Sequence, residues 1–159
     1  MLAALLCIIG IMLLALAITI RIISKADKDI DISLLKATKF SYMFNVMNQW
    51  MQALHAGKSM ERYLIDSGYE KIAIYGICNI GERLFEHLAE TNITIAYAID
   101  KNRELSNCDI NVYKPTDELP PVDLVVVTTA LYFYEIKRQL QEKVKCPIIS
   151  IEELIERMK

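Results

Sequence analysis

Residues 76–81 read Gly-Ile-Cys-Asn-Ile-Gly, which is the spacing of a phosphate-binding turn between a strand and a helix. In the pattern GxGxxG, the first glycine allows a tight turn off the strand, and the last lets the helix pack closely on the sheet. Backbone N–H groups at the start of the helix then attract an anion. Cys78 replaces the middle glycine, so a side chain stands where a pyrophosphate would approach most closely. The alternative interpretation is a turn that has no ligand and keeps Gly76 and Gly81 for packing.

A carboxylate and two hydroxyls are predicted to lie beside this turn. Asp100 ends the second predicted strand, 24 positions after Gly76, where dinucleotide-binding folds place the acid that holds the ribose hydroxyls. Lys101 follows it and is compatible with a phosphate on that ribose, while Thr128 and Thr129 end the fourth predicted strand. The predicted nucleotide-binding residues are Gly76, Ile77, Cys78, Asn79, Ile80, Gly81, Asp100, Lys101, Thr128 and Thr129.

Three polar side chains at the start of the following helix act on the same anion site. Asn79 is expected to cap this helix, with Glu82 three residues later as the second member of a capping box. The charge of Glu82 opposes a bound phosphate, and the charge of Arg83 favours one.

Few side chains have the types and spacing that catalysis needs. Tyr97 and Lys101 match the YxxxK of short-chain dehydrogenases, but that motif requires a helix. On the strand predicted here, the two residues lie about 13 Å apart. His87 is expected on the surface of a helix, and Cys78 is expected to be a small turn residue rather than a reactive thiol. We therefore expect no catalytic residue, and an NAD-dependent oxidoreductase or epimerase-like enzyme completed by a partner is the alternative.

The composition argues against several further classes of function. The net charge of −2 includes no block of like charges, and binding nucleic acid requires a basic surface. The four cysteines form no CxxC pair, so we expect reduced thiols and neither a disulfide framework nor a zinc site. Asp27, Asp29 and Asp31 are spaced like EF-hand calcium ligands, but Ile32 and Thr38 stand where that loop requires Gly and Glu. No metal is expected.

Strands and helices alternate from residue 70 onwards, and this alternation predicts an α/β fold. The predicted strands are residues 71–75, 94–99, 110–113, 123–128 and 147–151. The predicted helices are residues 79–91, 131–144 and 152–158, with a brief helical turn at 116–119. Because right-handed crossovers join parallel strands, we expect a Rossmann-like parallel sheet of about five strands in the order 3-2-1-4-5, covered on both faces.

The first 20 residues contain no charged side chain, and they are long enough to cross a bilayer as a helix. A cleavable signal peptide is the alternative, but no basic residue precedes the apolar run and the run continues past the small residues 15–17. The basic residues that follow the span mark its cytoplasmic side, and they are Arg21, Lys25, Lys28, Lys36 and Lys39. We expect a single-pass cell-membrane protein with its N-terminus outside and its C-terminal domain in the cytoplasm.

Residues 33–66 have a helical pattern, with a stop at Gly57 and a second short helix capped by Ser59. The apolar stripe of this connector consists of Phe40, Phe44, Met47, Met51 and Leu54, widened by Met43 and Trp50. We expect the stripe to pack on the domain or on a second copy of the chain, with a partner or membrane-surface site as the alternative. The predicted organisation is an anchor at 1–23, a juxtamembrane linker and helical connector at 24–68, and a Rossmann-like nucleotide-binding domain at 69–159.

Residues 44–88, followed by Ile-Ala-Tyr-Ala-Ile-Asp-Lys-Asn at 95–102, resemble a module of bacterial surface-polysaccharide biosynthesis proteins. The resemblance extends to about residue 155. The Rossmann part of this module is similar to the N-terminal nucleotide-sugar-binding domain of PglD-like sugar acyltransferases. It implies that Gly76, Gly81 and Asp100 contact a nucleotide sugar. The acyltransferase β-helix of that family is missing and Cys78 departs from its glycine, so acyltransferase activity is not implied.

Together these patterns predict a membrane-anchored cytoplasmic module that binds a nucleotide-type small molecule, with a nucleotide sugar or NAD(P) as the expected ligand. A role as sensor or scaffold in surface polysaccharide biosynthesis follows from the resemblance, with polysaccharide-assembly enzymes as expected partners. A ligand-free structural adaptor that docks through the connector stripe is a further alternative. Self-association is also expected, because a domain of this size buries a limited core.

Overall fold

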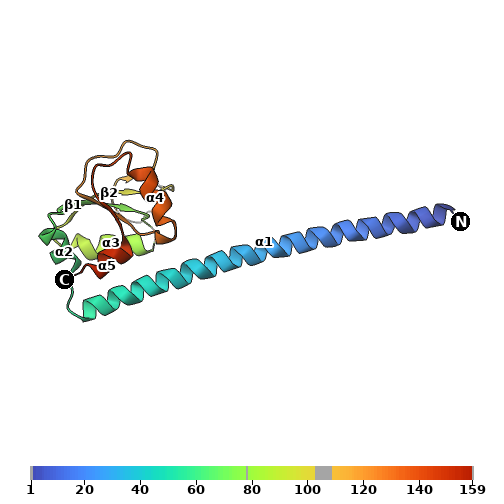
Figure 1. Ribbon diagram of the computed structural model, residues 1–159, viewed down its shortest axis with the longest axis horizontal. Coiled ribbons are helices and arrows are strands. Elements are labelled where there is room, and N and C mark those ends of the chain that lie inside the picture. Colours follow the sequence, from blue (N-terminus) through green and yellow to red (C-terminus); the bar gives the residue numbers. More distant parts are fainter. Residues whose placement is uncertain (1, 78, 103–108, 159) are drawn as a thin grey trace. The chain divides into compact units, whose positions relative to one another are not determined.

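The chain divides into two units, residues 1–41 and residues 42–159 (Figure 1). The computed structural model describes residues 2–77, 79–102 and 109–158. Helix α1 (Leu2–His55) forms the first unit and continues into the second. It runs without a break through residues 24–55, so the expected juxtamembrane linker and the first part of the connector are one continuous helix. The second, compact unit, which begins at residue 42, contains the end of α1 and the α/β fold.

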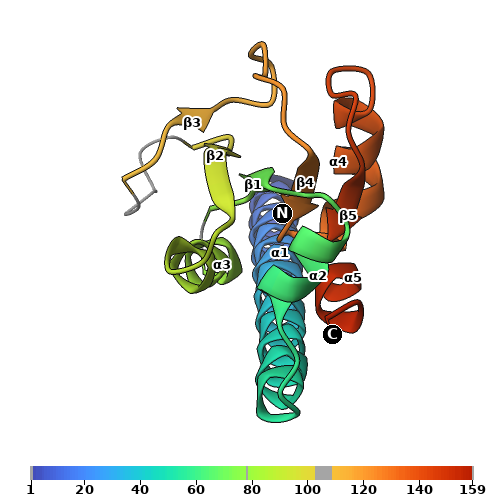
Figure 2. The ribbon, with the colours of Figure 1, turned by 90° about the vertical axis from the view of Figure 1, so that its left-hand side faces the viewer.

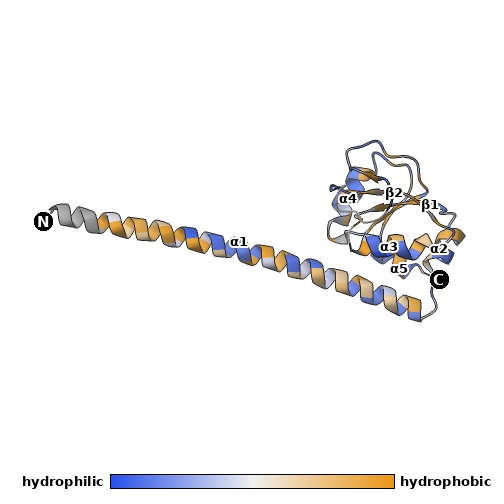
Figure 3. Cartoon of the chain, turned by 180° about the vertical axis from the view of Figure 1, so that it is seen from behind, coloured by the Kyte–Doolittle hydropathy of each residue, from blue (hydrophilic) through white to orange (hydrophobic). Residues whose placement is uncertain are grey.

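Helix α1 is long and apolar enough to cross a membrane. Within Ile9–His55, its most apolar window of 18 residues has a mean hydropathy of 2.0 and is 0% buried inside the protein. After the first few residues, α1 is coloured mostly as hydrophobic, and hydrophilic residues mix in further along the helix (Figure 3). The hydroxyl of Thr19 donates to the carbonyl of Ala15 at 2.9 Å, so this polar group is satisfied within the helix itself.

The second unit is built on a five-stranded sheet in which every pair of neighbouring strands is parallel. The strands are β1 (Lys71–Tyr75), β2 (Thr94–Ile99), β3 (Val112–Tyr113), β4 (Leu124–Val127) and β5 (Ile148–Ser150). Their order is β3-β2-β1-β4-β5, which confirms the predicted α/β class and strand order. All four residues of β4 are buried, as a central parallel strand requires.

Helices cover both faces of this sheet (Figure 2). The helices of this unit after α1 are α2 (Met60–Asp66), α3 (Ile80–Ala89), α4 (Phe133–Leu140) and α5 (Ile151–Glu156), with a short 3-10 turn η2 (Ala130–Tyr132) before α4. Side chains of α2, α3 and α5 pack with Ile72 and Ile74 of β1 on one face. Ile136 and Leu140 of α4 pack with Ala73 and Tyr75 on the other. Alternate residues of β1 therefore enter two separate apolar clusters.

The last part of α1 belongs to the first of these clusters. Val46 and Trp50 are 1% and 3% exposed, and the Trp50 ring makes an edge-on contact with the ring of His87 on α3. In contrast, Phe40, Phe44 and Met51 are exposed. The expected packing of the apolar stripe on the domain is therefore right in part. Trp50 is in the cluster and Met43, Met47 and Leu54 pack against it, whereas the three exposed residues do not.

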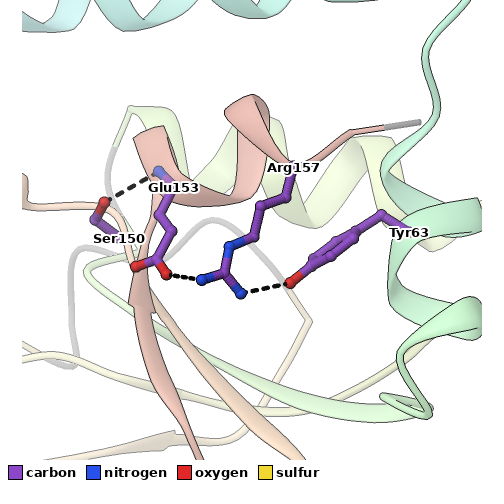
Figure 4. A network of polar contacts seen from close by, with 4 residues as sticks. All are labelled: Tyr63, Ser150, Glu153 and Arg157. Carbon is purple, nitrogen blue, oxygen red and sulfur yellow. Dashed lines mark hydrogen bonds and ion pairs between the residues drawn. The ribbon is translucent and has the colours of Figure 1, made fainter.

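The termini of the short helices follow the expected chemistry in most places. Ser59 caps α2 by accepting from the backbone N–H of Arg62, as predicted, and Ser150 caps α5 by accepting from Glu153. The guanidinium of Arg157, the residue directly after α5, donates to the carboxylate of Glu153 and, at 3.0 Å, to the hydroxyl of Tyr63 on α2 (Figure 4). This network ties α5 to α2 on one face of the sheet. The helical turn expected at residues 116–119 is not present; a hydrogen-bonded turn lies at residues 114–117 instead, in which the Asp117 N–H donates to the Lys114 carbonyl.

Candidate ligand site at the carboxyl ends of the strands

The carboxyl ends of β1, β2 and β4 meet beside the turn at residue 76. From β1 the chain first adds β2 and β3 on one side of the sheet, and it then adds β4 and β5 on the other side of β1. The direction in which strands are added therefore reverses between β1 and β4. Open parallel sheets bind ligands at such a switch point, because the loops there diverge and leave a crevice. The order of the strands therefore places any ligand site near Gly76.

Gly76 and Gly81 both sit where a side chain would collide with its surroundings. Gly76 has a φ of +89°, and a Cβ on it would lie 2.8 Å from the Thr128 hydroxyl oxygen. A Cβ on Gly81 would lie 1.9 Å from the carbonyl oxygen of Gly76, which is a backbone atom and has little room to move. Packing alone therefore requires both glycines, whatever the site binds.

The buried hydroxyl of Thr128 stabilises this turn. Its side chain is 3% exposed, and its hydroxyl lies 2.5 Å from the Gly76 carbonyl oxygen and 3.0 Å from that of Tyr75. A hydroxyl has one proton, so it donates to one of these carbonyls at a time. Thr128 thus fixes the geometry of the turn, and its hydroxyl does not face a ligand.

Asp100 lies beside the turn and is already hydrogen-bonded to the backbone. One carboxylate oxygen accepts from the N–H of Ile77 at 3.2 Å, and the other accepts from the N–H of Asn102 at 2.9 Å. A carboxylate offers about four lone-pair sites, so half of its accepting capacity is left for a ligand. The geometry thus brings together the glycine turn and the acidic strand end, as the sequence predicted.

A hollow of about 290 Å³ opens between these groups and the start of α4. Its lining comprises Tyr75, Gly76, Asp100, Lys101, Thr129, Tyr132, Glu135, Ile136 and Gln139. Burial raises the pKa of the Tyr75 phenol, and the nearby negative charges of Asp100 and Glu135 raise it further. The hollow thus combines a protonated phenol, two carboxylates and one ammonium group, a set suited to hydroxyl-rich ligands.

A second hollow, of about 520 Å³, adjoins the first and shares Lys101 and Gln139 with it. Its other lining residues are Lys114, Pro115, Thr116, Glu142 and Lys143. The ammonium group of Lys143 donates to the backbone carbonyl of Pro115 at 2.7 Å, which holds this positive charge at the rim. Three lysines against one glutamate make the second hollow the more cationic of the two.

Four of the predicted site residues line the first hollow, and they are Gly76, Asp100, Lys101 and Thr129. The side chains of Ile77 and Ile80 are buried in the core, so only the Ile77 backbone N–H reaches the site. Cys78 lies outside the described residues. The prediction that Asn79 caps α3 is wrong: it has a φ of +50° and its side chain makes no capping hydrogen bond. The Asn79 side chain is exposed instead.

The charges next to the start of α3 differ from expectation. The Arg83 guanidinium lies 2.7 Å from the Glu86 carboxylate and 4.0 Å from that of Glu82, so carboxylates of its own helix pair with it. His87 is also not a plain surface residue, because it is half-buried against Trp50 and burial lowers its pKa. Among the described residues, no group of three His, Cys, Asp or Glu side chains could hold a metal ion.

Sequence reasoning missed Tyr75, Tyr132, Glu135 and Gln139. Tyr75 immediately precedes the glycine turn, and its position at a strand end was a usable signal. Tyr132, Glu135 and Gln139 are spaced by three and four residues, so they share one side of the helix after β4. Nothing in their types sets them apart from other polar helix residues, and only the packing of α4 on the sheet brings them to the hollow.

The site defines an α/β protein with a ligand-sized hollow at the switch point of a parallel sheet. The chain matches no protein-family description, no curated protein and no solved structure.

Proposed function

We propose that this chain is a membrane-anchored cytoplasmic module whose Rossmann-like domain binds a nucleotide or nucleotide sugar. The observation that carries the proposal is the hollow between the glycine turn, Asp100 and Thr129 at the switch point. Its volume of about 290 Å³, together with the adjoining cationic hollow, gives room for a ligand of nucleotide size.

The nucleoside sugar is assigned to the side of the hollow formed by Asp100. Each oxygen of this carboxylate accepts one backbone hydrogen bond, and its remaining lone pairs suit a pair of neighbouring hydroxyls. Glu135 adds a second acceptor, and the phenol of Tyr75 adds a donor. Two carboxylates repel phosphate, so the hydroxyl-bearing part of the ligand fits here better than its phosphates.

The phosphates are assigned to the lysine-lined hollow. Lys101 borders both hollows and so connects the two parts of the ligand, with Lys114 and Lys143 further along. At the start of α3 the guanidinium of Arg83 is paired with the carboxylate of Glu86, and Glu82 adds a negative charge. We therefore expect the phosphates to lie away from the glycine turn, where Cys78 replaces the glycine of closest approach.

Membrane anchorage rests on the apolar part of α1, and its orientation on the basic residues that follow that part. Residues 1–20 contain no charge, and Arg21, Lys25 and Lys28 come directly afterwards. Basic residues flank the cytoplasmic end of a span. The role as sensor or scaffold in surface polysaccharide biosynthesis rests on the resemblance to PglD-like nucleotide-sugar-binding domains.

A ligand titration of the full chain in detergent micelles tests the proposal. UDP-sugars, UDP, NAD and CoA are added separately, and the thermal unfolding midpoint is followed by the fluorescence of Trp50, the single tryptophan. A ligand at a hundred times its Kd stabilises the folded state by about 2.7 kcal/mol, which a midpoint shift easily reveals. Stabilisation by NAD alone would favour the oxidoreductase alternative.

The matched variants are Asp100→Asn and Glu156→Gln. Both remove one negative charge, but Glu156 is exposed on α5 and does not line either hollow. We expect Asp100→Asn to weaken binding about tenfold or more, the size of one lost charged hydrogen bond, and Glu156→Gln to leave it unchanged. If none of the compounds shifts the midpoint, the proposed function is wrong.

A further inference from the structure

Helix α1 carries an apolar seam with a seven-residue repeat. Its positions alternate at intervals of three and four residues, and they are Ile23, Ala26, Ile30, Ser33, Ala37, Phe40, Phe44, Met47, Met51 and Leu54. Nine of these ten residues are apolar. A mean spacing of 3.5 residues keeps such a seam facing a second helix over many turns, as in a left-handed coiled coil.

The other features of α1 agree with this repeat. A polar residue directly follows every second seam position, namely positions 23, 30, 37, 44 and 51. These polar residues are Ser24, Asp31, Thr38, Asn45 and Gln52. The one polar seam residue, Ser33, donates its hydroxyl to the carbonyl of Asp29 at 2.8 Å. Because this hydroxyl is satisfied within the helix, Ser33 can enter a dry interface without a lost hydrogen bond.

The α/β unit covers a different face of the helix. Val46 and Trp50 are buried in its core, and neither lies on the seam. The seam residues Ile30, Phe40 and Phe44 are 63%, 65% and 62% exposed, and Met51 is 48% exposed. The seam residues Met47 and Leu54 are partly buried against the α/β core. The seam positions from Ile23 to Phe44, and Met51, are exposed.

We propose that the seam binds the same seam of a second copy of this chain, in a parallel, in-register two-stranded coiled coil. A two-fold axis between identical helices places each seam residue opposite its own counterpart, so a stripe with this repeat is complementary to itself. The parallel direction rests on the proposed membrane anchorage, because two anchors that enter one membrane from the same side run the same way. The dimer itself does not depend on nucleotide binding.

A membrane surface does not fit the seam equally well. Helix α1 has no break between its apolar part and the seam, so Phe44 lies about 30 Å along the helix axis from residue 24. A membrane-surface helix would have to turn into the plane of the interface directly after the span. The unbroken helix instead carries the seam away from the bilayer.

The exposed area is sufficient for a stable pair. A phenylalanine can bury about 200 Å², so the two exposed rings of each copy offer about 500 Å² in the dimer. The exposed side chains of Ile23, Ile30 and Met51 on each copy supply the rest of the roughly 1,000 Å² that a specific interface requires.

Cysteine scanning along residues 31–40 of the full chain, in native membranes under mild oxidation, tests the register. Each variant adds one cysteine, and the parent chain with its four native cysteines measures the background. We expect disulfide-linked dimer to peak at Ser33→Cys, Ala37→Cys and Phe40→Cys, and to fall to background at Thr38→Cys. A disulfide requires Cβ atoms about 4 Å apart, which only facing positions reach. Equal cross-linking at Ala37→Cys and Thr38→Cys would overturn the proposal.

A second measurement uses the mass of the purified full chain in detergent. The variants Ile30→Asn and Phe44→Asn place a polar group on the seam, while Leu35→Asn changes an equally apolar residue that is 47% exposed and off the seam. We expect each seam variant to raise the Kd of the dimer about thirtyfold or more, the size of a hot-spot loss, and Leu35→Asn to leave it unchanged. Because these side chains are outside the core, Trp50 fluorescence should show that every variant is folded. A monomeric parent chain would contradict the proposal.

Discussion

Replacing Gly81 by alanine should destabilise the α/β unit strongly, although alanine is the better helix former. The new Cβ would lie 1.9 Å from the Gly76 carbonyl oxygen, so the first turn of α3 must move by more than 1 Å to reach an ordinary contact. That movement also disturbs the Thr128 hydroxyl, which holds the same carbonyl at 2.5 Å. Overpacking of this kind costs about 3 kcal/mol, and the gain of about 1 kcal/mol in helix propensity offsets only part of it.

The net loss of about 2 kcal/mol can be measured by urea unfolding of the full chain in detergent, followed by Trp50 fluorescence. Trp50 is 3% exposed in the α/β core and is the only tryptophan, so its emission reports this unit alone. Gly10→Ala is the matched control, because Gly10 is also helical but a Cβ there meets nothing within 4 Å. An unchanged urea midpoint for Gly81→Ala would show that strand and helix do not approach as closely as described.

Two further predictions concern the support of the turn and the docking of α1. Thr128→Val should lower the free energy of unfolding by about 1–3 kcal/mol, because a buried carbonyl loses its donor. Thr129→Val, at the exposed neighbouring position, should change it by less than about 0.5 kcal/mol. Similar urea midpoints for the two variants would contradict the role assigned to Thr128. Burial against Trp50 lowers the pKa of His87, so the unfolded chain takes up a proton more readily than the folded one, and stability should be complete above the ordinary pKa of 6.5 and decrease as the pH falls below it. Urea midpoints between about pH 7.5 and pH 5.5 should show this decrease in the parent and a smaller one in His87→Gln, and equal slopes would assign the effect to other groups.

The sheet could be predicted from the sequence because its information is local. Continuous apolar runs such as residues 124–127 mark buried parallel strands, and amphipathic stretches between them mark covering helices. The right-handedness of crossovers then leaves few strand orders, and the observed β3-β2-β1-β4-β5 order is the predicted one. The strands differ from prediction only at their ends, as in the two-residue β3, where hydrogen bonds to neighbours decide the boundary. The helical turn expected at residues 116–119 is the exception among the helices, because it is absent.

The candidate site could be predicted only in part. Gly76 and Asp100 follow strands, and strand ends meet at one edge of a parallel sheet, so their proximity followed from the fold. The positions of Thr128 and Asn79 did not follow, because a hydroxyl or amide can turn inward or outward at the same place in the sequence. The Thr128 hydroxyl turns inward because it bonds to the backbone carbonyls of Tyr75 and Gly76. Asn79 has a φ of +50° and makes no side-chain capping hydrogen bond.

The N-terminal helix shows the same division. The sequence alone established an uncharged stretch long enough to cross a membrane, basic residues after it, and an apolar stripe at helical spacing. Only the tertiary structure decided which face of that helix is buried, because Trp50 and Phe44 are equally suited to a core by type. The α/β unit packs against only one face of the helix. Val46 and Trp50 are buried there, whereas Phe40, Phe44 and Met51 are exposed. Composition and periodicity determine that a residue can be buried, whereas the shape of the surface it meets determines whether it is.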